Sequence, residues 1–131
     1  MTYDFQVTTV VAARAELVYE TWISSAGHTA MTGADANIDA SVGGRYDACD
    51  GYITGHTVAL DPGHRIRQSW RTTDFSDDDL DSEIDVLLEA VDGGTRVTIA
   101  HSFVPAGQRH YEEGGWEDSY FEPMRAYFAS L

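Results

Sequence analysis

The segment GGWEDSYFEPMRAYFASL, residues 114–131, limits the folds open to this chain of 131 residues. Within it, Trp116, Tyr120, Met124 and Phe128 recur at every fourth position, and charged side chains lie between them. This spacing predicts an amphipathic helix that buries one face. That face carries Trp and Tyr where a helix that only fills a core would carry Leu, Ile and Val. Such a face can cover a surface that is itself partly polar.

The residues before this helix predict an antiparallel meander of strands. A strand is expected over residues 3–11, and helical spacing follows in residues 13–24 and 25–33. Six strand-like segments come next, separated by Gly, Asp and Pro residues that are typical of turns. Short turns between successive strands indicate antiparallel neighbours. The six segments are residues 36–42, 44–49, 51–60, 64–72, 81–91 and 95–103.

Alternation within the strands predicts one apolar and one wet face of the sheet. Over residues 64–71, for example, Ile66, Gln68 and Trp70 alternate with arginines and a serine. The expected fold is α+β: a curved antiparallel sheet wrapped around a long C-terminal helix, with two short helices after the first strand, in one domain over residues 1–131. The side chains expected on the covered face are His56, Val58, Leu60, Ile66, Gln68, Trp70, Ile84, Val86, Leu88, Val97, Ile99, His101 and Phe103.

The chain is strongly acidic. It has 22 Asp and Glu residues against eight basic residues, all of them Arg, which gives a formal net charge of -14. Such a surface repels nucleic acid and anionic membranes, so neither is an expected partner. Two explanations for the charge stay open. One is adaptation to concentrated salt inside the cell, which screens the self-repulsion; the other is a GC-rich genome that favours Arg codons over Lys codons.

The same composition bears on where the protein is expected to act. No apolar run reaches the length of about 18 residues that a membrane-spanning helix requires. The first residues, MTYDFQVTTVV, lack the basic and apolar regions of a secretory signal. The single Cys49 cannot form an internal disulfide. A cytoplasmic protein, monomeric or weakly dimeric, is the simplest expectation.

The covered face includes polar side chains, and buried polar groups need hydrogen-bond partners. Two interpretations of His56, Gln68 and His101 stay open: they are satisfied residues of the core, or they orient a small molecule in a cavity beneath the helix. The cavity interpretation predicts a ligand-binding site formed by His56, Gln68, Trp70, His101, Phe103, Trp116, Tyr120 and Met124.

Five longer motifs occur in a fixed order: MTG at 31–33, GGRYDACDGYITG at 43–55, LDPGHRIRQSWR at 60–71, GGTRVTIAHSFVP at 93–105 and GWEDSYFEPMRAYF at 115–128. Together they resemble the carboxy-terminal-type domain of the activator of heat-shock protein 90 ATPase homologue family, within the START-like (SRPBCC) superfamily. The resemblance covers about residues 12–130 and implies a helix-grip fold. These motifs specify a shape and name no reaction.

The resemblance leaves three functions open. START-like domains commonly hold an apolar or aromatic small molecule between sheet and long helix, so a non-enzymatic binding domain is the first expectation. The first alternative is a co-chaperone-like activator of heat-shock protein 90 ATPase. The separate amino-terminal module of the eukaryotic activator is not expected here, since the first strand begins almost at residue 1. The second alternative is a cyclase- or hydrolase-like enzyme in the same cavity, with His56 or His101 as the acid–base group.

No metal or cofactor site is expected. The five His residues show no paired spacing, and the lone cysteine has no partner. Asp77, Asp79 and Asp81 resemble the start of a calcium loop. Ser82, however, stands where that loop needs Gly, and Leu88 stands where it needs its bidentate Glu. A solvated acidic loop is the better interpretation.

Pro123 predicts an irregularity in the C-terminal helix. Its nitrogen carries no hydrogen for the Ser119 carbonyl, and its ring crowds that carbonyl, so a bend is expected between the two residues. The alternative is a shorter helix that starts only at Glu122, with Pro123 in its first turn. The spacing of Trp116 and Tyr120 favours a helix that already exists before Pro123.

Overall fold

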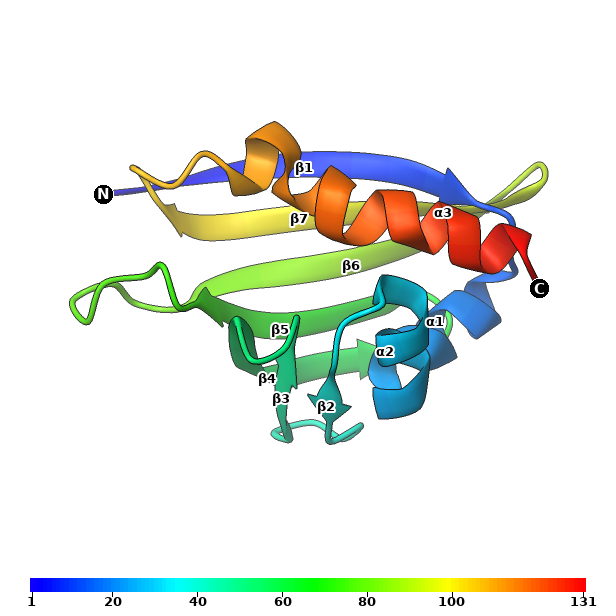
Figure 1. The fold of residues 1–131 in the computed structure, drawn as a ribbon, viewed down its shortest axis with the longest axis horizontal. Coiled ribbons are helices and arrows are strands. Elements are labelled where there is room, and N and C mark those ends of the chain that lie inside the picture. Colours follow the sequence, from blue (N-terminus) through cyan, green and yellow to red (C-terminus); the bar gives the residue numbers. More distant parts are fainter.

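A seven-stranded antiparallel sheet curves around a C-terminal helix, as predicted (Figure 1). The computed structural model describes residues 1–131, and the strands lie in the order β1-β7-β6-β5-β4-β3-β2 across the sheet. No helix combines the length and the apolar character that crossing a membrane requires. The elements are β1 (Thr2–Val11), α1 (Ala15–Ile23), α2 (Ser25–Thr32), β2 (Asn37–Ile38), β3 (Arg45–Ala48), β4 (Ile53–Asp61), β5 (Arg65–Thr72), β6 (Ser82–Val91), β7 (Gly94–Pro105), η1 (Tyr111–Gly115), η2 (Glu117–Phe121) and α3 (Glu122–Ala129).

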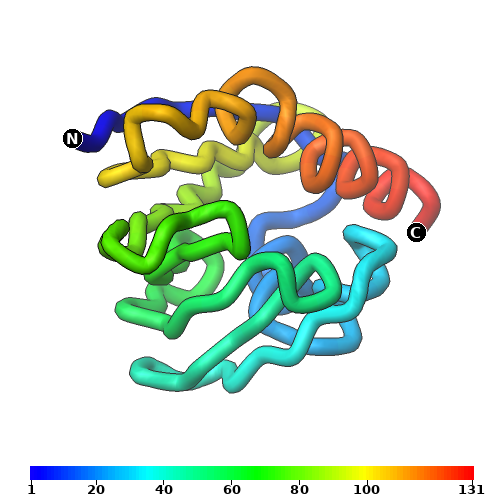
Figure 2. The backbone as a smooth tube through the Cα atoms, turned by 60° about the vertical axis from the view of Figure 1, so that its left-hand side comes forward, coloured from blue at the N-terminus to red at the C-terminus, as the bar shows by residue number.

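Of the two short helices, α2 packs against α3, and α1 packs against α2 and against β6 and β7 of the sheet. Ser24 caps the start of α2, since its hydroxyl accepts a hydrogen bond from the Gly27 N–H at 3.1 Å. Gly33 ends α2 in the left-handed conformation, with φ 81°. Trp22 of α1 and Met31 of α2 are almost fully buried. Figure 2 shows these helices and the end of α3 on the same side of the molecule, so they close that end of the core.

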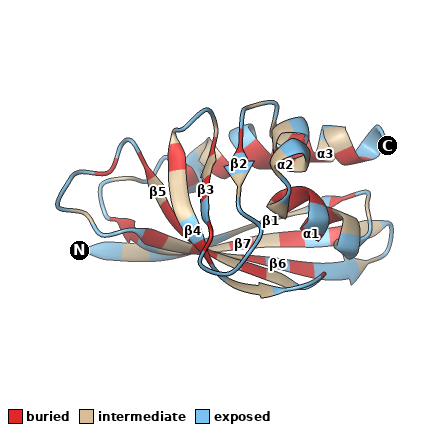
Figure 3. Cartoon of the chain, turned by 90° about the horizontal axis from the view of Figure 1, so that it is seen from below, coloured by how far each residue is buried: buried red, intermediate tan, exposed pale blue.

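Strand β5 displays the predicted faces. Ile66, Gln68 and Trp70 are buried, and Figure 3 shows how buried and more exposed residues are distributed over the strands. Arg65 and Arg67 lie on the opposite face, with nitrogens 2.7 and 3.0 Å from the carboxylate of Asp85 on β6. The register of this strand is therefore the one that the alternation predicts.

Strand β4 differs from the prediction. His56 and Val58 are exposed, and Thr57 between them is buried. The Thr57 hydroxyl accepts a hydrogen bond from the side-chain amide of Gln68 at 3.5 Å, and a bulge between Thr57 and Ala59 then shifts the pairing with β5. The inward position predicted for His56 and Val58 was wrong, because the bulge shifts the alternation by one residue and places Thr57 on the inner face instead.

A second irregularity turns Phe103 of β7 outward. Phe103 has φ 61°, its side chain is 56% exposed, and its N–H donates a 3.0 Å hydrogen bond to Oδ1 of Asp4. The pairing of β7 with β1 shifts register at this point, so Val104 is buried in its place. The inward position predicted for Phe103 was wrong. Alternate residues from His101 would place Phe103 inward, but the bulge inserts one extra residue, so Val104 points inward instead.

The C-terminal helical segment exists before Pro123, as its sequence spacing indicated. Elements η1 and η2 are π-helical, and α3 follows η2 without a gap. The chain bends at Gly114, whose φ and ψ of 160° and -18° are not helical. Pro123 occupies the first turn of α3, directly after the wide turn η2. The bend predicted between Ser119 and Pro123 was therefore wrong: the α-helix itself begins at Glu122 with Pro123 in its first turn, as in the alternative interpretation, and the turn before it is π-helical.

This π-turn explains the four-residue spacing of the buried aromatic residues. An α-turn holds about 3.6 residues and a π-turn holds more, so a helix with both can keep every fourth residue on one face. Trp116, Tyr120, Met124 and Phe128 are all buried. The wide turn also buries Phe121, which the spacing alone did not include.

Candidate functional site

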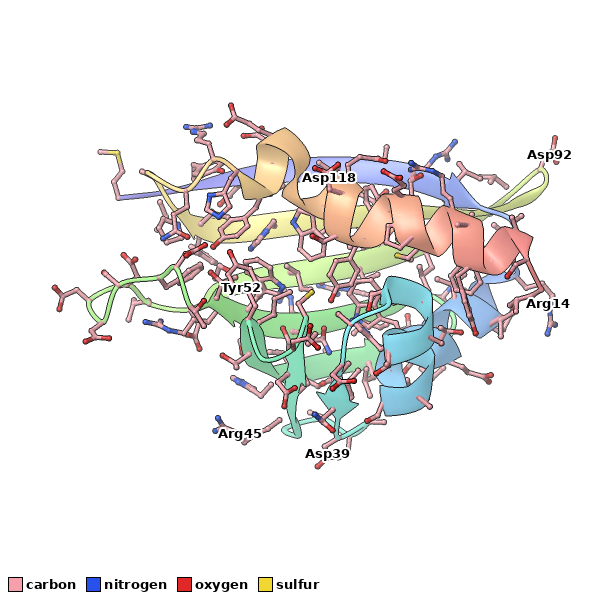
Figure 4. The ribbon with its side chains drawn as sticks, in the orientation of Figure 1. Arg14, Asp39, Arg45, Tyr52, Asp92 and Asp118 are labelled. Atoms are coloured by element: carbon pink, nitrogen blue, oxygen red, sulfur yellow. The ribbon has the colours of Figure 1, made fainter.

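A pocket of about 290 Å³ lies between the C-terminal helical segment and the turn that joins β3 to β4. The turn contributes two side chains, the strands β4 and β5 contribute two, and the remainder come from the start of the helical segment. Figure 4 labels Tyr52, which lies at the end of the molecule where the β5–β6 loop leaves the sheet. The lining residues are Cys49, Tyr52, Ile53, Trp70, His110, Tyr111, Gly115, Trp116, Ser119 and Tyr120.

The β3–β4 turn has an uncommon backbone conformation. Cys49, Asp50 and Gly51 are consecutive residues with positive φ, at 52°, 58° and 89°. Two hydrogen bonds hold the turn to the segment after α2: Asp50 N–H donates to the Asp35 carbonyl at 3.1 Å, and Asp35 N–H donates to Asp50 Oδ1 at 2.9 Å. The turn is therefore anchored where it brings Cys49 and Tyr52 to the pocket.

Aromatic rings form most of the pocket wall and pack on one another. The centroids of Trp70 and Tyr111 are 4.9 Å apart, and their planes meet at 86°. Trp116 packs on Trp70 at 5.5 Å and on Tyr120 at 5.0 Å. Such edge-to-face and tilted contacts are the favoured geometries for aromatic pairs. They stiffen a wall that comes from β5 on one side and from the helical segment on the other.

Two lining residues, Tyr52 and His110, contact Asp74 in the β5–β6 loop, which does not itself line the pocket but lies beside it. The Tyr52 hydroxyl donates to Asp74 Oδ2 at 2.5 Å, and Nε2 of His110 lies 3.4 Å from the same oxygen. The Asp74 side chain is 53% exposed, so this carboxylate lies at the rim. Three separate segments therefore meet at the mouth.

Tyr111 joins the pocket wall to the same rim. Its hydroxyl donates to Oε1 of Gln108 at 2.7 Å and lies 2.5 Å from Oγ1 of Thr72. The Gln108 side-chain amide in turn donates to the Asp74 carbonyl at 2.9 Å. Burial raises the pKa of Tyr111, so the phenol stays protonated. The residues that lead into the helix are thus hydrogen-bonded to the β5–β6 loop.

His101 is a satisfied residue of the core behind the pocket wall. Its Nδ1 accepts from the Trp116 indole N–H at 3.2 Å, and its Nε2 donates to Oγ of Ser82 at 2.9 Å. Ser82 donates its own hydrogen to the Trp70 carbonyl at 2.7 Å. Burial lowers the pKa of His101 to about 3. A neutral imidazole with both nitrogens bonded has nothing left to offer a ligand.

His28, which the sequence did not single out, occupies a similar position under Tyr120. Its Nδ1 donates to the Trp22 carbonyl at 2.8 Å, and its Nε2 accepts from the Tyr120 hydroxyl at 2.7 Å. Burial lowers the pKa of His28 to about 4, although the bond to the Trp22 carbonyl opposes the shift. This pair fixes the Tyr120 ring as part of the pocket wall.

The predicted binding residues separate into two groups. Trp70, Trp116 and Tyr120 line the pocket. The other five do not line it. Two of these are exposed, namely His56 and Phe103, and three are buried elsewhere in the core, namely Gln68, His101 and Met124.

The residues that sequence reasoning missed lie mainly outside regular strands. Cys49 and Tyr52 flank the Asp50-Gly51 turn signal, and Tyr111 precedes Trp116 by five positions. Alternation along strands cannot place turn residues, so these had no pattern to reveal them. The one indication in the sequence was Tyr52, an aromatic residue directly after the Asp50-Gly51 turn signal.

The pocket carries no cationic Arg side chain among its lining residues. Burial raises the pKa of the Cys49 thiol, although the nearby Tyr120 hydroxyl opposes the shift, so the thiol is protonated at neutral pH. No three His, Cys, Asp or Glu side chains are grouped so that they could hold a metal ion. The site is thus an apolar, ring-lined hollow with a carboxylate at its rim.

Comparison with known proteins places this architecture in a family. The family model described as Activator of Hsp90 ATPase homolog 1-like protein matches residues 12–129. An activator of 90 kDa heat shock protein ATPase homolog from Dictyostelium discoideum is 26% identical over 113 residues, which are 85% of this chain and 29% of that protein. A protein from Schizosaccharomyces pombe is 24% identical over 127 residues, which are 97% of this chain and 38% of that protein. The chain therefore spans less than two-fifths of the length of these curated relatives.

The fold is also found in solved structures. An HSP90 activator from Plasmodium falciparum superposes with a TM-score of 0.84 at 21% identity, over 95% of this chain and 94% of that one. At this identity the likeness concerns the fold alone. Since the family model matches most of the chain and the helix-grip fold is in place, the chain belongs to the family of Activator of Hsp90 ATPase homolog 1-like proteins.

Proposed function

We propose that this chain is a non-enzymatic domain that binds a small apolar or aromatic molecule in the pocket beneath η1 and η2. The observation that supports this is the pocket itself, with rings as walls and a few polar groups at its mouth. That combination is typical of small-molecule sites. At about 290 Å³ the pocket is at the lower end of the volumes such sites have, which favours a ligand with one ring or two.

A binding role is favoured over a catalytic one by the state of the nearby histidines. Acid–base catalysis needs a titratable group that reaches the substrate. His28 and His101 are both neutral, and hydrogen bonds within the protein occupy all their ring nitrogens. The imidazole that does line the pocket is that of His110, at the exposed rim.

A co-chaperone role is the second candidate, and the names of the relatives favour it. Because this chain spans less than two-fifths of those relatives, their activity does not transfer with the family. A surface of net charge -14 would also need a basic patch on the partner. Stimulation of the ATPase of an Hsp90 chaperone by the purified chain would support this role, and it should not depend on whether the pocket is filled.

The test of the binding proposal is an NMR titration of the labelled protein with a neutral single-ring probe, 3-tert-butylphenol. We expect saturable shifts at Trp70, Tyr111 and Trp116. The substitution Ser119→Phe places a ring at the pocket mouth and should abolish the shifts. Ala126→Phe adds the same ring to an exposed position of α3 and should leave them unchanged. Shifts scattered over the surface, or equal binding by both variants, would contradict the proposal.

A further inference from the structure

Five of the ten pocket-lining residues are aromatic, and none carries a fixed positive charge. The rings come from the turn, from β5 and from the helical segment, and they meet at angles between 35° and 86°. An aromatic ring presents a negative face, and several rings around one hollow attract a cation within about 6 Å of their centroids. The five aromatic residues are Tyr52, Trp70, Tyr111, Trp116 and Tyr120.

The charges around the hollow have the sign that a cation requires. The Asp74 carboxylate lies at the rim, held by the Tyr52 hydroxyl at 2.5 Å and facing Nε2 of His110 at 3.4 Å. No arginine is placed to neutralise it: Arg71 lies over the Phe75 ring and bonds the Asp79 carbonyl, and Arg109 lies over the Tyr3 ring. A net charge of -14 adds a long-range attraction for cations.

We propose that the pocket binds a small organic cation, an aromatic or alkyl ammonium compound, with its apolar body between the rings and its charge toward the Asp74 carboxylate. This rests on the proposed binding function and names the chemical class of its ligand. An anion of the same size is disfavoured, since the lining offers it no arginine and the Asp74 carboxylate lies next to two of the lining residues. A neutral ring fits the walls but leaves the rim carboxylate without a charged partner.

Three probes that differ only in one substituent of a phenol test this inference by calorimetric or NMR titration. They are 3-(trimethylammonio)phenol, its neutral isostere 3-tert-butylphenol, and the anion 3-hydroxybenzoate. We expect the cation to bind about tenfold more tightly than the neutral isostere at low salt, because each cation–π contact adds to the same apolar burial. The anion should bind most weakly of the three.

Two matched substitutions test whether the preference for the cation depends on Asp74. Asp74→Asn and Asp92→Asn change the net charge equally, but Asp92 lies in the β6–β7 turn, at the opposite end of the molecule from Tyr52 (Figure 4). We expect Asp74→Asn to lower the affinity for the cation about fivefold, the size of a modest electrostatic contact, while its affinity for 3-tert-butylphenol stays the same. Asp92→Asn should change neither affinity.

The possible outcomes separate this inference from the function on which it rests. If the neutral isostere binds as tightly as the cation, the cation inference is wrong and the binding function stands. If Asp74→Asn and Asp92→Asn lower the affinity for the cation equally, the preference for the cation is an effect of net charge, and the role assigned to Asp74 is wrong. If none of the three probes binds at the pocket, both the inference and the binding function fail.

Discussion

Trp116 donates its indole N–H to Nδ1 of His101 at 3.2 Å, and this bond fixes the ring that the pocket shares with the core. Both residues are almost fully buried. The bond links the helical segment to β7 across the sheet–helix interface. A pocket wall that is held in this way does not depend on a ligand to keep its shape.

We therefore expect Trp116→Phe to destabilise the protein through His101. The phenyl ring keeps most of the apolar contact but leaves a buried imidazole nitrogen without a donor, which costs about 1–3 kcal/mol. Chemical denaturation at neutral pH measures the loss. Tyr127→Phe, on the same helix at a half-buried position, is the matched control and should change the free energy of unfolding by less than about 0.5 kcal/mol. Equal effects of the two substitutions would show that the hydrogen bond contributes nothing.

The two buried histidines predict a fall in stability in mild acid. The pKa of His28 is lowered to about 4 and that of His101 to about 3, both from 6.5 and both by burial. The unfolded chain therefore takes up these protons at about pH 6.5, whereas the folded protein does so only at lower pH. The two neutral histidines therefore do not reduce the free energy of unfolding above pH 6.5. As the pH falls from 6.5 toward 4, each of them lowers this free energy by up to about 1.4 kcal/mol per pH unit.

Urea unfolding at a series of pH values between about 7 and 5 measures this slope. His28→Gln removes one titrating group and should make the slope shallower. His64→Gln replaces an exposed histidine and should leave it unchanged. A slope that is the same in the wild type and in His28→Gln would show that folding does not lower the pKa of this ring.

The sequence predicted the elements of this fold better than the faces of its strands. Seven strands, two short helices and a C-terminal helix follow from turn signals and periodicity, and Trp70, Trp116 and Tyr120 do line the pocket. The positions of His56 and Phe103 could not be predicted correctly, because bulges in β4 and β7 reset the alternation. A bulge depends on pairing with a neighbouring strand, which local sequence does not encode.

Seven of the ten residues that line the pocket were not predicted, several of them for a related reason. Cys49 and Tyr52 reach it through a turn with three successive positive φ values, only one of them at a glycine. Tyr111 belongs to a π-turn that precedes the regular helix. Neither conformation has a strong local signal, and both are held by tertiary contacts.

At Gly55 of β4, the backbone of β5 and the ring of Tyr46 both approach closely. A Cβ atom there would lie 2.1 Å from the Ser69 carbonyl oxygen and 2.8 Å from the Tyr46 ring. Because backbone cannot yield as a flexible side chain does, we expect Gly55→Ala to destabilise the protein by about 3 kcal/mol, the upper end of the usual cost of overpacking a core site. Gly107→Ala is the control, since a Cβ atom at that residue would meet no other atom within 4 Å. Thermal melts of the two variants should differ clearly; similar melting temperatures would mean that β4 and β5 can separate at little cost.

The net charge of -14 predicts that salt stabilises the folded chain. Salt weakens two opposing effects: the repulsion among 22 acidic residues, and the attraction in exposed ion pairs such as that of Arg96 with Glu89. An exposed pair contributes at most about 1 kcal/mol, and eight arginines cannot offset the acidic excess, so screening should stabilise the folded chain. We expect the melting temperature to rise steadily from dilute buffer to about 2 M KCl. Asp77→Asn together with Asp78→Asn, both exposed in the β5–β6 loop, should raise stability at low salt and reduce the gain from KCl. A melting temperature that salt does not change in either protein would leave codon usage as the explanation for the acidic surface.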